Sequence, residues 1–186
     1  AGLPVMCHLD WPPPSPIEVI NRLREGDVLT HCFRPFPAAP ARSDGRIREE
    51  ILEARERGVI FDIGHGVGSF GFETAETMLN AGFLPDAISS DVHSLSIKGP
   101  AYDQLVTLSK FLHLGMSITD IIGASTTGPA RAIRRPDLGT LSPGSIGDAT
   151  ILSIEKGDFI FTDSLGHTRS GEKKFTLKGI VLDCLL

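Results

Sequence analysis

Four histidines and one aspartate lie at or just beyond the ends of short apolar runs that are typical of β-strands. They are His8, His31, His65, His93 and Asp91. Imidazole and carboxylate groups together suit a borderline divalent ion such as Zn²⁺, and an incomplete set of protein ligands leaves a position for water, whose pKa falls from about 15.7 to about 7. The chemistry that this pattern predicts is attack by hydroxide at neutral pH, with Asp91 taking up the proton and returning it to the leaving group.

Strand-like and helix-like segments alternate along residues 4–114. The predicted strand and helix pairs are 4–8 with 17–24, 27–31 with 46–57, 59–63 with 72–81, and 87–91 with 102–114. A complete β/α barrel takes roughly 250 residues and eight such units, and its active site lies at the carboxyl ends of the strands. Four units with histidines at their strand ends therefore predict half of a TIM-like (β/α)8 barrel, and a small doubly wound sheet is the competing fold.

The last part of the chain has a different pattern. A further helix is predicted over 118–133, interrupted or kinked at Gly128-Pro129. Beyond Pro136, short strands predicted at 138–141, 149–154, 159–162 and 175–182 alternate with turns, which is typical of antiparallel sheets. We therefore expect a half barrel over residues 1–135 and part of a small β-sandwich domain over residues 136–186, with a fold class of α/β.

A glycine-rich segment between a predicted strand and a predicted helix admits two interpretations. Gly66, Gly68 and Gly71 have the G-x-G-x-x-G spacing, and Asp86 follows Gly66 by twenty residues. That combination is a fair dinucleotide fingerprint. The strand-end histidines favour the other interpretation, a glycine loop that lets the backbone approach a substrate.

Composition excludes several classes of partner. The chain has 186 residues, 41% hydrophobic and 22% charged, and a formal net charge of −5 with no long run of like charges. It offers no electrostatic footprint for nucleic acid or for a membrane surface, so a small-molecule substrate is expected. No stretch approaches the roughly 20 apolar residues of a membrane span, and a cytoplasmic location follows by default. Cys7, Cys32 and Cys184 are too few for a disulfide framework and are expected to be reduced thiols.

The same segments, taken in order, resemble the amidohydrolase superfamily. The resemblance is closest to its bacterial deacetylase-type branch, often labelled dihydroorotase-like or adenine-deaminase-like. The segments that carry it are Pro4-Val5-Met6-Cys7-His8, residues 26–33, Phe61-Asp62-Ile63-Gly64-His65-Gly66 and Ser89-Ser90-Asp91-Val92-His93, which look like barrel strands five to eight, and residues 127–131 and 139–149, which are similar to the exit into the family's β-sandwich.

The resemblance implies a role for each site residue. His8, His31 and Asp91 would be metal ligands, with Asp91 also the catalytic general base, and His65, Gly66 and His93 would line the substrate pocket. The implied cofactor is a divalent metal, with Zn²⁺ as the first choice and one or two ions in the complete site. The family also uses a His-x-His pair on its first strand and often a carboxylated lysine on its fourth, and this sequence contains neither segment.

The function that we expect is hydrolysis of a C–N amide or related ester bond of a small acylated substrate through metal-bound hydroxide. The chain starts without a methionine and runs at once into an apolar segment. We therefore expect it to need a missing amino-terminal half or a second chain, including a homo-oligomeric partner, for activity. The alternative function is a non-catalytic half-barrel scaffold or interaction module.

Overall fold

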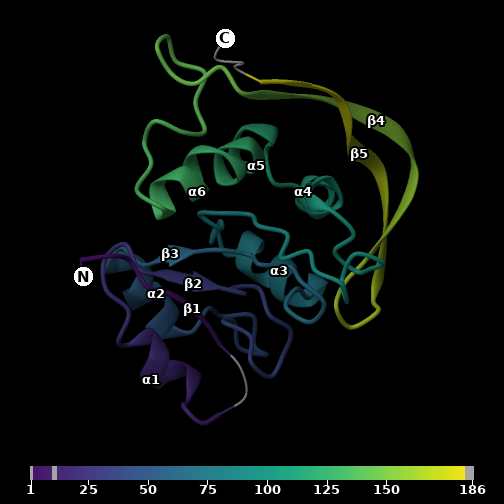
Figure 1. Cartoon of the computed structure of the whole chain (residues 1–186). Helices are drawn as coiled ribbons and strands as arrows, with labels where there is room; N and C mark the ends of the chain where they lie inside the picture. Colours follow the sequence, from purple (N-terminus) through teal and green to yellow (C-terminus); the bar gives the residue numbers. More distant parts are fainter. Residues whose placement is uncertain (1, 10–11, 183–186) are drawn as a thin grey trace.

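Three short parallel strands, in the order β1–β2–β3, form a sheet in the computed structural model, which describes residues 2–9 and 12–182 (Figure 1). The strands are β1 (Met6–His8), β2 (Val28–Thr30) and β3 (Ile60–Phe61). Met6 lies beside Val28, and Val28 beside Ile60. Because neighbours in the sheet are also neighbours in the sequence and all run in one direction, the ends of the strands reach the same edge.

The segment predicted as a fourth strand, residues 87–91, follows β3 without forming a regular strand. A parallel bridge joins Asp62 to Ala87, and the amides of Ile63, His65 and Gly66 donate to the carbonyls of Ala87, Ser89 and Ser90. Gly64 and Gly66 have positive φ angles of 48° and 51°, which turn the backbone out of the extended conformation. The prediction of a regular strand here was wrong, although the segment lies at the expected position beside β3.

Within the described residues, six helices alternate with and follow the strands. They are α1 (Pro16–Ile20), α2 (Glu49–Glu56), α3 (Phe72–Asn80), α4 (Gln104–His113), α5 (Ile118–Ser125) and α6 (Thr127–Ala132). The break between α5 and α6 falls at Thr126, whose φ and ψ are −130° and −84°, and not at Gly128-Pro129 as predicted. Pro129 is tolerated because it lies in the first turn of α6, where the amide that it lacks would have no partner within the helix.

The carboxy-terminal part of the described chain is one long antiparallel hairpin. Its strands are β4 (Ala149–Thr162) and β5 (Thr168–Val181). The two strands predicted at 149–154 and 159–162 are therefore a single strand, with an irregular register between Lys156 and Phe159, and residues 138–141 form no strand. The hairpin curves along the molecule on the side away from β1–β3, with α4 packed beneath it (Figure 1).

Aromatic side chains fill the core between the sheet, α3 and α4. Phe33, Phe61, Phe70, Phe72 and Phe111 are all 0% exposed. Phe70 is at the centre, with ring centroids 5.5 Å from Phe72 and 5.6 Å from Phe111. Because Phe70 belongs to the glycine-rich segment, this packing fixes one end of that loop.

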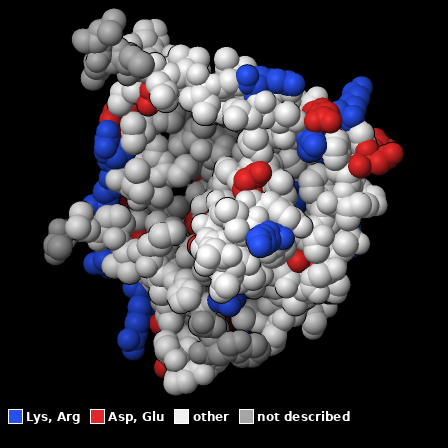
Figure 2. Space-filling view, turned by 45° about the vertical axis from the view of Figure 1, so that its right-hand side comes forward, with Lys and Arg blue, Asp and Glu red and all other residues white. Residues whose placement is uncertain are grey.

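On the face drawn in Figure 2, basic and acidic side chains are interspersed, and the described residues form no large patch of one sign. None of the helices within residues 2–9 and 12–182 has the length and apolar character needed to span a membrane. Cys7 is partly buried and Cys32 is buried, and both are free thiols. Cys184 lies outside the described residues.

Candidate active site

His31 directly follows β2, and its side chain is held by the glycine loop. Its Nδ1 atom lies 2.7 Å from the carbonyl oxygen of Gly64. A carbonyl can only accept a hydrogen bond, so Nδ1 carries the proton and Nε2 keeps a free lone pair. This is the arrangement by which a backbone carbonyl orients an imidazole that binds a metal ion through its other nitrogen.

His8 and Asp91 are the neighbours of that imidazole. The rings of His8 and His31 meet edge to face, with centroids 5.4 Å apart. Burial lowers the pKa of His31, the Gly64 contact and the charge of Asp91 raise it, and the charges of Arg34 and His8 lower it. The net lowering favours the neutral imidazole, which is the form that binds a metal ion. The ring of His31 thus lies beside that of His8 and under the electrostatic influence of Asp91, so the three predicted ligands lie in one region of the structure.

Gly66 makes room for the carboxylate of Asp91. A Cβ atom at residue 66 would lie 2.5 Å from Oδ2 of Asp91, so any other side chain would force the two apart. His31 and Asp91 themselves have positive φ angles of 62° and 46°, in the left-handed region that residues other than glycine rarely adopt. Strained backbone of this kind persists only where its surroundings hold it, and it is concentrated at functional sites.

Asp62 is a buried acid that sequence reasoning missed. Its Oδ2 atom accepts hydrogen bonds from Thr30 Oγ1 (2.6 Å) and Ser89 Oγ (2.8 Å), while Oδ1 is buried with no hydrogen-bond partner among the described residues. Burial raises the pKa of this carboxyl, against the lowering effect of the two hydroxyls. The signal that could have identified it was an aspartate placed directly after an apolar run, two residues before the glycine loop.

The nitrogen and oxygen donors around His31 are of the kinds that Zn²⁺ prefers, and no hydrogen bond joins Nε2 of His31 to the part of the chain that the structure describes. Within the described residues, however, no group of three or more His, Cys, Asp or Glu side chains is close enough to hold a metal ion by itself. His8, His31 and Asp91 thus fit a metal ion as a partial set of ligands, in which further donors are required.

Two of the predicted pocket residues lie differently from the expectation. His65 is 0% exposed: its Nδ1 is 3.0 Å from the carbonyl oxygen of Gly66, its Nε2 is 2.6 Å from Nζ of Lys110, and its ring stacks on Phe70 at 4.7 Å. Both ring nitrogens of His65 are therefore engaged within the protein. His93 is exposed, and its Nδ1 accepts a hydrogen bond from the amide of Leu95 at 3.3 Å.

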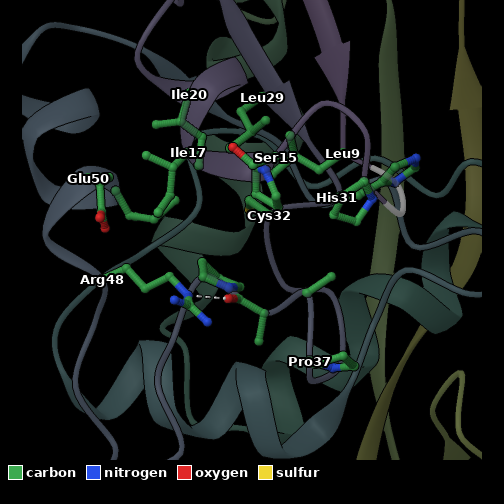
Figure 3. A pocket seen from close by; sticks show the side chains of 16 residues that line it. Leu9, Ser15, Ile17, Ile20, Leu29, His31, Cys32, Pro37, Arg48 and Glu50 are labelled. Carbon is green, nitrogen blue, oxygen red and sulfur yellow. Dashed lines mark hydrogen bonds between the residues drawn. The ribbon is translucent and has the colours of Figure 1, made fainter.

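A cavity of about 290 Å³ adjoins His31 on the side of α1 and α2 (Figure 3). Its wall is mainly apolar and includes Leu9, Ile17, Ile20, Leu29 and Ile51. Polar groups are few. The Arg48 side chain, also on the wall, donates from Nε to the carbonyl of Ala39 at 3.0 Å, and the Glu50 carboxylate has one buried oxygen with no hydrogen-bond partner among the described residues. A small apolar group would fit there.

The acid of the dinucleotide fingerprint is engaged elsewhere. Asp86 Oδ1 pairs with Arg131 at 2.9 Å, and Oδ2 accepts from the amide of Phe61 at 3.0 Å and lies 3.5 Å from Arg55. A dinucleotide site needs this carboxylate for the ribose hydroxyl. Its commitment to two arginines disfavours that interpretation and supports the substrate-loop interpretation.

Comparisons with known proteins agree with this geometry. No protein-family model matches the chain. It is 35% identical over 174 residues to a deacetylase of Enterococcus faecalis and 37% identical over 168 residues to a deacetylase of Brucella anthropi, which covers 92% and 88% of this chain. Among solved structures, an adenine deaminase matches 97% of the chain with a TM-score of 0.92 at 34% identity, and a dihydroorotase matches 97% with a TM-score of 0.82 at 33% identity.

These likenesses confirm the resemblance to the amidohydrolase superfamily, whose barrel proteins share this mixed α/β fold. The relatives that this chain matches include the two bacterial deacetylases. The chain spans about half the length of the relatives that it matches, 47% and 41% of the two deacetylases and 50% and 47% of the two solved structures.

Proposed function

We propose that this chain carries part of the active site of a metal-dependent amidohydrolase that cleaves a C–N amide or related ester bond of a small acylated substrate. The observation that carries the proposal is His31, whose Nδ1 is oriented by the Gly64 carbonyl, beside the ring of His8 and under the electrostatic influence of Asp91. The relatives support it, because proteins named deacetylase, adenine deaminase and dihydroorotase all hydrolyse C–N bonds.

The proposed architecture is half of a (β/α)8 barrel over residues 1–135, corresponding to strands five to eight, and part of a β-sandwich over residues 136–186. The parallel order β1–β2–β3, continued by residues 86–90, supports the first part. The second part is supported by the β4–β5 hairpin, which leaves Ile151, Ile160 and Ile180 more than half exposed. On this proposal the remaining half of the barrel, or a second chain, supplies the other ligands.

His8, His31 and Asp91 would hold a divalent ion, with Zn²⁺ as the first choice. When bound, such an ion lowers the pKa of a coordinated water to about 7 and polarises the scissile carbonyl. The carboxylate of Asp91 takes the proton from the attacking water and returns it to the leaving nitrogen or oxygen. Gly66, having no side chain, keeps Oδ2 of Asp91 unobstructed for that transfer.

The apolar cavity beside His31 supports a substrate with an apolar acyl group. Its walls include isoleucine side chains from both α1 and α2, and His31 forms part of its border (Figure 3). Burying one methylene there contributes about 0.8 kcal/mol. Discrimination between acyl chains would thus follow from the size of this cavity.

The alternative function, a non-catalytic scaffold, is favoured by one observation: the described residues contain no closed group of three metal-binding side chains. Metal content and turnover of the intact protein separate the two functions. We expect stoichiometric zinc by elemental analysis and hydrolysis of N-acetylated amines or acetyl esters. Zinc should be lost on His31→Ala and retained on His167→Ala, a control at an exposed turn.

Asp91→Asn tests the proton transfer itself. Because the carboxylate acts on the reacting water, we expect kcat to fall by roughly a hundredfold or more with KM little changed. If substrate binding weakened as much as kcat fell, Asp91 would be a metal ligand and not the general base. An intact protein that holds no divalent ion and hydrolyses none of these substrates would favour the scaffold.

A further inference from the structure

Lys110 is a buried lysine whose amino group is surrounded by hydrogen-bond partners; burial lowers its pKa to about 7, against the raising effect of the Asp163 charge. Lys110 lies in α4 and is 0% exposed. Its Nζ is 2.8 Å from the carbonyl oxygen of Pro100, 2.7 Å from that of Thr162 and 2.6 Å from Nε2 of His65. An ammonium group has three N–H donors and no acceptor. These three atoms therefore satisfy it, and its third donor is committed to an imidazole.

Contacts with Gly66 and Lys110 together fix the tautomer of His65. The carbonyl of Gly66, 3.0 Å from Nδ1, can only accept, so Nδ1 carries the proton and Nε2 of the neutral ring accepts from Nζ of Lys110, whose other two donors go to the carbonyls of Pro100 and Thr162. Burial and, second, the charge of Lys110 lower the pKa of His65 to about 3, so the ring stays neutral at physiological pH. Stacking on Phe70 fixes the plane of the ring.

His65 stands between the two glycines that touch the candidate site. Gly64 presents its carbonyl to Nδ1 of His31, and Gly66 lies against the carboxylate of Asp91. The ring of His65 is hydrogen-bonded to the Gly66 carbonyl, and the same short stretch of backbone carries the Gly64 carbonyl that contacts His31. Lys110 is thus linked to the surroundings of His31 and Asp91 by the ring of His65 and the backbone of residues 64–66.

We propose that Lys110 is a positioning residue: its amino group fixes the ring of His65, and through the backbone of residues 64–66 it orients His31 and Asp91. This inference rests on the proposed function, because the orientation of His31 and Asp91 matters only if these residues bind a metal ion. A purely structural role is the competing explanation. Removing the amino group leaves the carbonyls of Pro100 and Thr162 and Nε2 of His65 without their donor, so a loss of stability alone does not separate the two explanations.

The test uses the intact protein labelled with ¹⁵N at histidine, first without metal. In the wild type, His65 and His31 should each show a protonated Nδ1 and an unprotonated Nε2. In Lys110→Met we expect His65 to populate both tautomers and the Nδ1 signal of His31 to shift, and zinc affinity measured afterwards to fall at least tenfold.

Ser109→Ala is the matched control. Ser109 is the adjacent buried residue of α4, and its hydroxyl accepts from the amide of Phe175 without touching His65. It should lose stability but keep both histidine spectra and the zinc affinity. If Lys110→Met does not fold, Lys110→Gln, whose side-chain amide can either donate or accept and so does not select one tautomer, takes its place with the same expected spectral change.

The outcome that overturns the proposal is a folded Lys110 variant whose His65 and His31 signals match the wild type. Failure of the proposed function is distinguishable, because it would appear as an absence of zinc binding in the wild-type protein. The tautomer signals are read without metal and decide the positioning role separately.

Discussion

The Gly64 carbonyl oxygen and Nδ1 of His31, 33 residues apart in sequence, lie 2.7 Å apart. This single contact determines which nitrogen of the imidazole is available to a ligand. It also explains why residue 64 is a glycine with a φ of 48°, since a Cβ there would collide with the side chains of both Thr30 and His31. The orientation of the histidine is therefore a property of the loop as much as of β2.

Alanine at Gly66 should disturb the site without disturbing the core. The new methyl group would meet Oδ2 of Asp91 at 2.5 Å, and residue 66 has a φ of 51°, so we expect Asp91 to be displaced and zinc affinity to fall by roughly 10- to 100-fold. Titration calorimetry with zinc measures this. Gly68→Ala in the same loop is the control, because a Cβ there meets nothing within 4 Å. Equal losses in the two variants would contradict the prediction.

Removal of the Asp163 carboxylate should destabilise the protein. Asp163 is 1% exposed, and it accepts hydrogen bonds from the amides of Phe72 (3.0 Å), Leu165 (2.9 Å) and His167 (2.9 Å). Asp163→Ala leaves these amides without their acceptor, and we expect the free energy of unfolding in urea to fall by about 3 kcal/mol. Asp158→Ala, on an exposed stretch of β4, should change it by less than about 0.5 kcal/mol. Similar values for both variants would show that the Asp163 contacts are energetically minor.

Acid should destabilise the fold through His65. Its pKa is lowered to about 3 in the folded protein, from an ordinary value of 6.5. Below pH 6.5 the histidine is protonated in the unfolded chain, while the buried ring stays neutral in the folded protein. The contribution of His65 to the free energy of unfolding is therefore complete above pH 6.5. It is lost as the pH falls toward 3, by up to about 1.4 kcal/mol per pH unit. Urea unfolding at several pH values should show a flatter pH dependence for His65→Gln than for the wild type. His93→Gln, at an exposed residue, is the control, and its stability should depend on pH as that of the wild type does. The same pH dependence in all three proteins would contradict the role given to His65.

The alternation of strands and helices was predictable because each element has its own hydrophobic period and ends in recognisable turn or cap residues. Ser15 and Glu18, for example, form a capping box at the start of α1. The proximity of His8 and His31 followed from the same pattern, because parallel strands end at one edge of a sheet. Their separate roles as ligands stay a prediction.

The direction of His65 and the burial of Lys110 could not be predicted from local pattern. Positive φ at Gly64 and Gly66 turns the His65 side chain into the core, and nothing in a strand period encodes that turn. Lys110 was not singled out from the sequence; β5 packs against α4, and Thr107, Ser109 and Lys110 are all at most 1% exposed. Tertiary packing decided both outcomes.

The tip of the hairpin also determines when the loop can become ordered during folding. Ser164 and Asp163 bind the backbone of Phe70 and Phe72 across sequence separations of 94 and 91 residues. On a ribosome, the glycine loop is synthesised long before the segment that holds it. Closing so long a loop is slow, because its entropic cost precedes any contact. We therefore expect the imidazole of His31 to acquire its final orientation late, after the hairpin has docked.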